Sequence, residues 1–156
     1  MLKEEQNMKT LVLGIGNPIL SDDAVGIKIA QLLEQQKPGL AVEQTNEAPI
    51  ALIDLITGYD KLIIIDSIKT EQGKPGELHK LELDDFSSSQ DFPFSHGMDI
   101  ATAFEVGKNL GCRMPQSVRI YAIEVKDNET FAEQCTPEVA EKIPAVVEQI
   151  INEERL

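Results

Sequence analysis

A short apolar segment followed by a glycine-containing turn constrains the fold more than any other feature. Lys9–Ile15 is almost continuously apolar, which is typical of a strand buried on both faces of a parallel sheet. The turn Gly14–Leu20 leads to Ser21, an expected helix N-cap. Asp22 and Asp23 would then lie in the first helical turn, where the helix dipole favours acidic side chains. We therefore expect a buried strand, a tight turn and a helix in succession.

The remaining chain continues this alternation of strands and helices. The order predicts an α/β fold, a single three-layer α/β/α domain over residues 1–156 with a mostly parallel twisted sheet and helices on both faces. A length of 156 residues suits one domain, and residues 1–7 are expected to form a disordered leader. The further expected strands are Leu40–Gln44, Lys61–Asp66, Glu77–Leu83 at an edge and Ser117–Val125, and the further helices are Pro49–Ile56, Asp99–Asn109 and one from Pro137 towards Arg155, kinked at Pro144.

The charge of the chain narrows the classes of partner. Fourteen Lys and Arg against twenty-seven Asp and Glu give a net charge of −13. Nucleic acids and anionic membrane surfaces are bound by clustered cations, so neither is an expected partner. The polar start of the chain does not resemble a signal peptide, and no apolar run could span a bilayer. We expect a cytoplasmic protein whose partners are neutral or cationic molecules, metal ions or basic proteins.

Two glycines in the first turn raise the alternative of a nucleotide-binding module. A dinucleotide-binding turn has a third glycine where the helix packs against the strand, and Ile19 occupies that position here. Gln44 stands where such a fold places the acid that binds the ribose. A tight strand-to-helix turn explains Gly14 and Gly16 better than a bound nucleotide does.

Three polar side chains could carry chemistry at the carboxyl ends of the strands, where ligands bind in such folds. Asp23 follows the first strand, Asp66 closes an apolar strand, and His96 lies in a loop just before a helix. Two carboxylates and an imidazole suit a borderline divalent metal such as nickel, zinc or manganese. Each residue also has a structural alternative: Asp23 could favour its helix dipole, Asp66 could cap a turn, and His96 could be an ordinary loop residue. His79 is interpreted as a surface residue of an edge strand.

Other hydrolase arrangements are hard to assemble from this chain. There is no Gly-x-Ser-x-Gly or His-Glu-x-x-His motif. Cys112 and Cys135 are far apart, form no Cys-x-x-Cys pattern and stand in no motif that predicts a nearby histidine. If the protein is a hydrolase, the carboxylates, the loop histidine and a metal must carry the reaction.

These residues together resemble a known family. Leu11–Gly26 resembles the opening signature of the nickel–iron hydrogenase maturation proteases, Leu62–Ser67 resembles their central strand and aspartate, and Ser95–Gly97 is similar to their histidine loop. The resemblance extends over nearly the whole chain from Met8. Further matching positions, in the same order, are Pro75-Gly76, Ile120–Glu124 and Thr136–Val139.

The resemblance implies an endopeptidase that removes the C-terminal extension of the nickel-loaded precursor of a hydrogenase large subunit. Family enzymes are classed as aspartic-type peptidases, and their metal-contacting acid, central aspartate and histidine correspond to Asp23, Asp66 and His96. These three are therefore the expected catalytic and metal-contacting residues. Only the family alignment favours Asp23 over Asp22 as the metal-contacting acid. The nickel is expected to arrive on the precursor and not to be held permanently by the protease, which is expected to act as a monomer.

A nickel-binding maturation chaperone without hydrolytic activity is the main alternative function. One departure from the family pattern concerns the choice of precursor: many members have paired glycines where this chain has Thr45–Pro49. Phe86, Phe92 and Phe94 precede His96 and either contact the precursor or fix their own loop to the domain.

Overall fold

A computed structural model describes residues 8–46, 49–87 and 97–156. Within them, five strands form one sheet in the order β2-β1-β3-β5-β4. The four strands β2, β1, β3 and β5 run parallel, and β4 pairs antiparallel with β5 at the edge. This mostly parallel sheet confirms the predicted fold class. The strands are β1 (Thr10–Ile15), β2 (Ala41–Thr45), β3 (Lys61–Ile68), β4 (Leu78–Leu81) and β5 (Ser117–Glu124).

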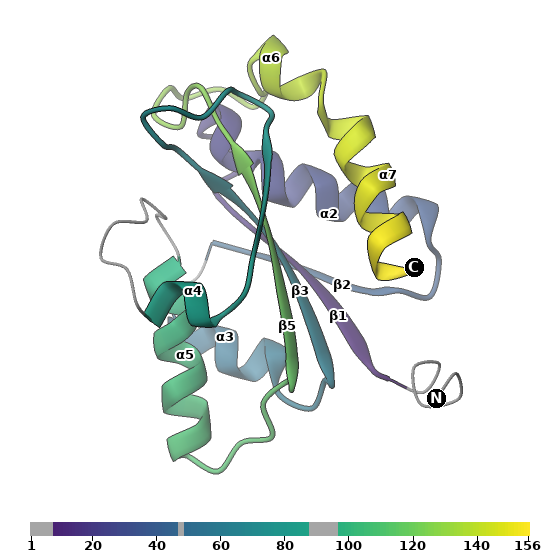
Figure 1. The fold of residues 1–156 in the computed structure, drawn as a ribbon, viewed down its shortest axis with the longest axis vertical. Coiled ribbons are helices and arrows are strands. Elements are labelled where there is room, and N and C mark those ends of the chain that lie inside the picture. Colours follow the sequence, from purple (N-terminus) through teal and green to yellow (C-terminus); the bar gives the residue numbers. More distant parts are fainter. Residues whose placement is uncertain (1–7, 47–48, 88–96) are drawn as a thin grey trace.

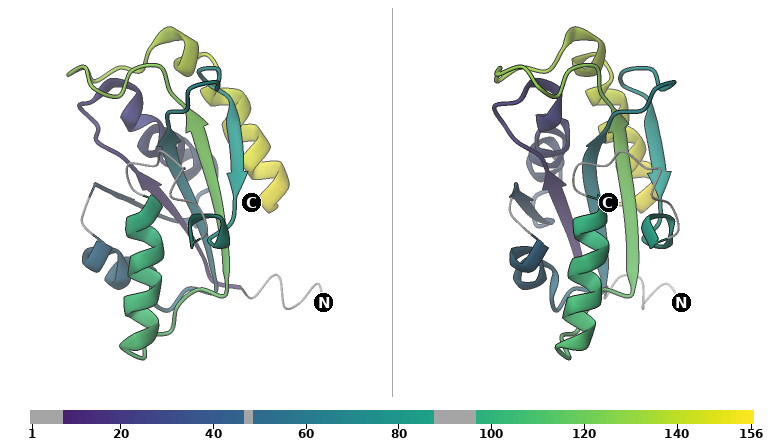
Figure 2. Two further views of the ribbon diagram at one scale, coloured as in Figure 1. Left: turned by 60° about the vertical axis from the view of Figure 1, so that its left-hand side comes forward. Right: turned by 90° about the vertical axis from the view of Figure 1, so that its left-hand side faces the viewer.

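Helices cover both faces of the sheet, as Figures 1 and 2 show. Helices α2 and α7 pack together on one face, and α3 and α5 pack together on the other. No helix in the described part of the chain is long and apolar enough to cross a membrane. The helices are η1 (Ser21–Ala24, a 3-10 turn), α2 (Val25–Gln36), α3 (Pro49–Ile56), α4 (Asp84–Ser87), α5 (Gly97–Asn109), α6 (Pro137–Ala140) and α7 (Ile143–Glu154).

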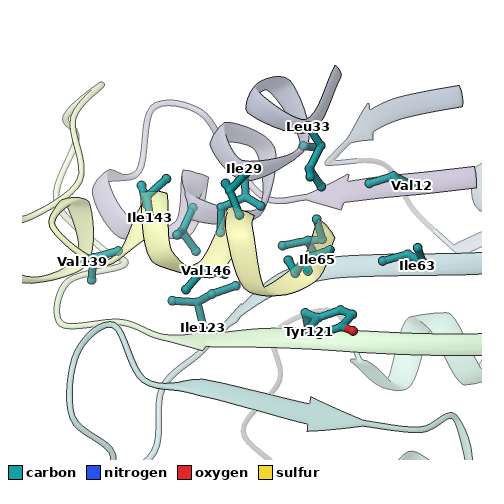
Figure 3. Close-up of a cluster of buried hydrophobic side chains, with 14 of the residues drawn as sticks. Val12, Ile29, Leu33, Ile63, Ile65, Tyr121, Ile123, Val139, Ile143 and Val146 are labelled. Atoms are coloured by element: carbon teal, nitrogen blue, oxygen red, sulfur yellow. The ribbon is translucent and has the colours of Figure 1, made fainter. Parts of the chain in front are cut away.

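The apolar run of β3 divides its side chains between two cores. Ile63 and Ile65 point to the core under α2 and α7, which Figure 3 shows, whereas Leu62 and Ile64 join the core under α3 and α5. All four are fully buried. Because successive strand residues face opposite sides of a sheet, a strand that is apolar at every position requires cover on both faces.

The start of the first helix differs from the expectation. Ser21 is not an N-cap: it begins the 3-10 turn η1 with a positive φ of 49°, and the α-helix starts at Val25. The turn is bonded to a distant segment instead, since Ser21 N–H donates to the carbonyl of Ala132 (2.9 Å). The prediction of a side-chain cap at Ser21 was therefore wrong, because tertiary contacts decide this turn.

The C-terminal helix and β3 also differ in extent from the prediction. Two helices, α6 and α7, replace the single kinked helix, and Pro144 lies in the first turn of α7. Proline fits there because N–H groups in the first turn of a helix have no intrahelical acceptor, so the N–H that proline lacks is not needed. Strand β3 continues two residues beyond Asp66, to Ile68.

Glycines allow close main-chain contacts between α2 and the sheet and within the turn before α2. A Cβ atom at Gly26 would overlap the carbonyl oxygen of Ile65, and one at Gly16 would overlap that of Asp23. A Cβ atom at Gly14 would likewise overlap the carbonyl oxygen of Gly26. Both glycines of the first turn therefore serve close packing of strand, turn and helix, as the tight-turn interpretation predicts.

Replacing Gly26 with alanine is expected to destabilise the protein by about 1–3 kcal/mol, the usual effect of overpacking. The added methyl group must displace the backbone of β3 or α2, because its neighbours are main-chain atoms. Urea denaturation measures the change. Gln35→Ala, on the exposed side of the same helix, is the control and should change stability by less than about 0.5 kcal/mol. Equal midpoints for wild type and Gly26→Ala would contradict this packing.

Candidate functional site

Two acidic side chains are buried at the carboxyl edge of the sheet, to which the arrowheads of β1, β3 and β5 point in Figure 2. Asp66 lies within β3, paired with Ala122 of β5, and is 1% exposed. Asp23 lies in η1, in the turn region after β1, and is 6% exposed. Acidic residues are rarely buried to this extent unless they have partners or a function.

Ser67 links the two acids. Its main-chain N–H donates to Oδ1 of Asp66 (2.8 Å), and its hydroxyl donates to Oδ1 of Asp23 (2.9 Å). Successive residues of β3 face opposite sides of the sheet, so the side chains of Asp66 and Ser67 lie on opposite faces. The Ser67 side chain lies on the α2 face, where its hydroxyl is bonded to Asp23 in η1. Ser67 thus bonds to both carboxylates, which lie near enough for the charge of Asp23 to raise the pKa of Asp66. Sequence reasoning missed Ser67, and its position directly after Asp66 was the available signal.

The carboxyl group of Asp66 is only half satisfied. Its Oδ2 atom is buried and has no hydrogen-bond partner among the described residues. Burial raises the pKa of Asp66 well above its ordinary value; the bond from Ser67 N–H lowers it, and the nearby Asp23 carboxylate raises it. An orphaned buried oxygen of this kind requires an explanation, such as a proton or a ligand at the site.

Both oxygens of the Asp23 carboxylate accept hydrogen bonds, which fix its orientation. Its Oδ2 accepts a hydrogen bond from Asn17 N–H (2.9 Å), in addition to the bond from Ser67 to Oδ1. The adjacent Asp22 has a different environment: it is fully buried and its carboxylate accepts hydrogen bonds from Thr136 and from main-chain N–H groups of residues 126 and 127. The two neighbouring acids therefore face different parts of the molecule, a distinction that the residue pattern alone left open.

His96, the third predicted site residue, lies outside the described residues, as do Phe92, Phe94 and the expected leader 1–7. Helix α5 begins at Gly97, and its buried side chains join the core that contains Leu62 and Ile64. Asp66 shares that face of β3 by alternation. Among the described residues no group of three His, Cys, Asp or Glu side chains is placed to hold a metal ion, so the predicted ligand set is not tested without His96.

A fourth buried acid, Glu124, lies at the end of β5. It is 1% exposed and accepts hydrogen bonds from the main-chain N–H of Thr70 (2.7 Å) and from its hydroxyl. His79 is half-buried, with Nε2 at 3.5 Å from Oε1 of Glu124. The interpretation of His79 as a surface residue was therefore wrong, because β4 lies against the buried end of β5.

The surroundings of Cys135 do not favour a reactive thiol. Cys135 is half-buried beside the main chain of Ser21, and burial raises the pKa of its thiol to about 11. The reactive form of cysteine is the thiolate, which such a pKa disfavours at neutral pH. A hollow of about 990 Å³ lies at the opposite edge of the sheet, where Thr10, Lys61 and Ser117 begin their strands.

Comparisons with known proteins identify relatives of this chain. The family model "HycI: Hydrogenase maturation protease" matches residues 27–153. The hydrogenase 2 maturation protease of Escherichia coli (strain K12) is 34% identical over 74 residues, which are 46% of this chain and 45% of that protein. The chain thus matches less than half the length of this curated relative.

Solved structures share the fold over almost the whole chain. The solution structure of an endopeptidase from Escherichia coli has a TM-score of 0.79 and 26% identity, covering 95% of this chain and 93% of that one. The hydrogenase maturating endopeptidase HybD from E. coli has a TM-score of 0.76, 26% identity and the same coverage. The [NiFe] hydrogenase maturation protease HybD from Thermococcus kodakarensis, at 22% identity and a TM-score of 0.77, covers 94% of this chain and 99% of that one and shows the same fold.

Proposed function

This chain belongs to the hydrogenase maturation protease family, and from that premise we propose that it is an endopeptidase. Its proposed reaction is removal of the C-terminal extension from the nickel-loaded precursor of a nickel–iron hydrogenase large subunit. The family match over residues 27–153 and the 26% identical endopeptidase structures support the hydrolytic class. The alternative of a nickel-binding chaperone has no observation in its favour, and the first-turn glycines that suggested a nucleotide are used for packing.

One observation carries the proposal: Ser67 is bonded to both Asp23 and Asp66 at the carboxyl edge, and Asp66 has a buried oxygen that finds no partner among the described residues. We assign aspartic-type chemistry to this pair, with His96 as the third member. In peptide hydrolysis, water adds OH to the carbonyl carbon and a proton to the leaving nitrogen as the C–N bond breaks. Two adjacent carboxyl groups can divide this proton transfer, one accepting from water and the other donating to nitrogen.

Nickel is the part of the substrate that this site would recognise. Two carboxylates and an imidazole are acceptable ligands for a borderline divalent metal, but three such ligands without a thiolate leave coordination positions open. We therefore propose that nickel arrives bound to the precursor and that Asp23, Asp66 and His96 contact it there. This arrangement would restrict cleavage to precursor that has received its metal.

The direct test is incubation of the purified protein with a nickel-loaded large-subunit precursor, followed by mass spectrometry of both products. We expect a shortened large subunit and a released C-terminal peptide whose masses sum to the precursor plus one water. Stable association without any change in precursor mass would instead support the chaperone alternative. A large subunit that lacks the extension is the control and should remain intact.

A further inference from the structure

The buried carboxylate of Asp22 connects η1, the turn that contains Asp23, to the segment between β5 and α6 by hydrogen bonds. Asp22 is fully buried, and its Oδ1 accepts hydrogen bonds from the main-chain N–H (2.6 Å) and hydroxyl (3.0 Å) of Thr136. Its Oδ2 accepts from the N–H groups of Lys126 and Asp127 (both 3.0 Å) and from the Thr136 hydroxyl (2.8 Å). Every partner of this carboxylate donates, so both of its oxygens are satisfied.

Main-chain hydrogen bonds reinforce the same connection. Asp22 N–H donates to the carbonyl of Asp127 (2.9 Å), and Ser21 N–H donates to that of Ala132 (2.9 Å). Ser21 has a φ of 49°, a left-handed conformation that costs a non-glycine residue about 1–3 kcal/mol. Such a conformation persists only where its surroundings impose it. The contacts of Asp22 and Ser21 therefore hold η1 in a shape that its own sequence does not favour.

The hydroxyl of Thr136 is bonded to Asp22 and does not cap α6, the helix that Thr136 precedes. It occupies the N-cap position of α6, where a threonine hydroxyl commonly accepts a bond from the first turn, yet it makes no side-chain capping bond. Its hydroxyl donates to Asp22 instead. Lys126 likewise contributes its main-chain N–H, while its side chain pairs with Glu138 at the surface (2.9 Å).

We propose that Asp22 is a positioning residue, which fixes the orientation of the Asp23 carboxylate through its bonds to Thr136, Lys126 and Asp127. Asp23 is the next residue in the turn, and its own bonds to Asn17 and Ser67 require the backbone of η1 to stay in place. A displacement of a reacting group by about 1 Å can lower a rate by about 100-fold. This inference rests on the proposed function, since it concerns the geometry of the proposed catalytic acid.

Thr136→Val tests the proposal with less risk to folding than Asp22→Asn, because it removes the hydroxyl but keeps the three main-chain donors. We expect kcat for precursor cleavage to fall by about 10-fold or more with KM nearly unchanged, because the substrate still binds while the acid is misplaced. Thr136→Ser keeps the hydroxyl and should retain wild-type kcat. Lys126→Ala removes the exposed ion pair with Glu138 and a weaker electrostatic interaction with Asp22 but keeps the main-chain donor, so it should also leave kcat within about twofold.

Hydrogen exchange of the Asn17 amide provides a readout that does not depend on activity. This amide donates to Asp23 Oδ2, so its exchange should accelerate in Thr136→Val and stay unchanged in Thr136→Ser and Lys126→Ala. Unchanged exchange together with a wild-type kcat per folded molecule in Thr136→Val would overturn the proposal, even if the melting temperature fell. A wild-type protein that cuts no precursor would refute the proposed function, whereas the exchange measurement would still decide whether Asp22 positions Asp23.

Discussion

Replacing Asp66 with asparagine is expected to abolish precursor processing and at the same time to stabilise the folded protein. Loss of one acid–base group lowers a rate by about 100-fold to 10,000-fold. Asparagine keeps an oxygen for the Ser67 N–H and removes the negative charge from a site that is 1% exposed. Substitutions that relieve a functional site in this way commonly gain about 0.5–2 kcal/mol. A loss of activity with a gain of stability would mark Asp66 as functional and not structural.

The stabilisation should depend on pH in a defined direction. Burial raises the pKa of Asp66 in the folded protein above its value in the unfolded chain. A group of this kind favours the folded state below its unfolded pKa, and that contribution is lost as the pH rises through the folded pKa. The advantage of Asp66→Asn should therefore be largest at neutral pH and shrink towards acid pH. Thermal unfolding measures it, at about 2–4 °C per kcal/mol for a chain of this size.

The matched control for this pair of measurements is Asp54→Asn, on the exposed side of α3. It makes the same chemical change at the surface and should alter stability by less than about 0.5 kcal/mol. Its processing rate should equal that of wild type. If Asp66→Asn were destabilised at neutral pH, the carboxylate would be a structural group of the fold, and its assignment to the catalytic pair would be wrong.

Chelator-treated protease is expected to cut nickel-loaded precursor at least about 100-fold faster than nickel-free precursor. Interactions that form only with the correctly loaded substrate can select it in this way, because binding energy is used to align the peptide bond with the catalytic groups. The proposed basis is the donor set: two carboxylates bonded to Ser67, together with His96, would make a site with open coordination positions. Gel electrophoresis of the precursor over time measures both rates.

Two outcomes would contradict the proposal that nickel arrives bound to the precursor. Equal rates for both forms of precursor would show that the metal is not recognised. A chelator-treated protease that cuts nothing until zinc is restored would show that the metal is a resident cofactor. Asp23→Asn provides a further comparison, because loss of one acid of the proposed catalytic pair should slow the cleavage of both forms of precursor, with a stability loss of only about 1 kcal/mol.

Much of the fold was predictable from local patterns in the sequence. The run Leu62–Ile65 is apolar at every position, so it had to be a strand covered on both faces, and the two cores under β3 confirm this. The helix Pro49–Ile56 begins and ends where its sequence predicts. The alternation of such segments predicted a mostly parallel sheet, and with it the edge at which Asp23 and Asp66 lie.

Tertiary structure alone decided how each polar residue at that edge is used. Asp22 and Asp23 are adjacent acids in one turn, but Asp22 is bonded to Thr136, 114 residues away, and Asp23 to Ser67, 44 residues away. Ser21 carries the sequence of an N-cap, yet its bond to Ala132 imposes a left-handed conformation. The sequence thus determined which elements form and which edge holds the acids, because hydrophobic patterns act locally along the chain. The bonds that distinguish Asp22 from Asp23, to Thr136 and to Ser67, come from distant segments, so only packing of the complete sheet could select them.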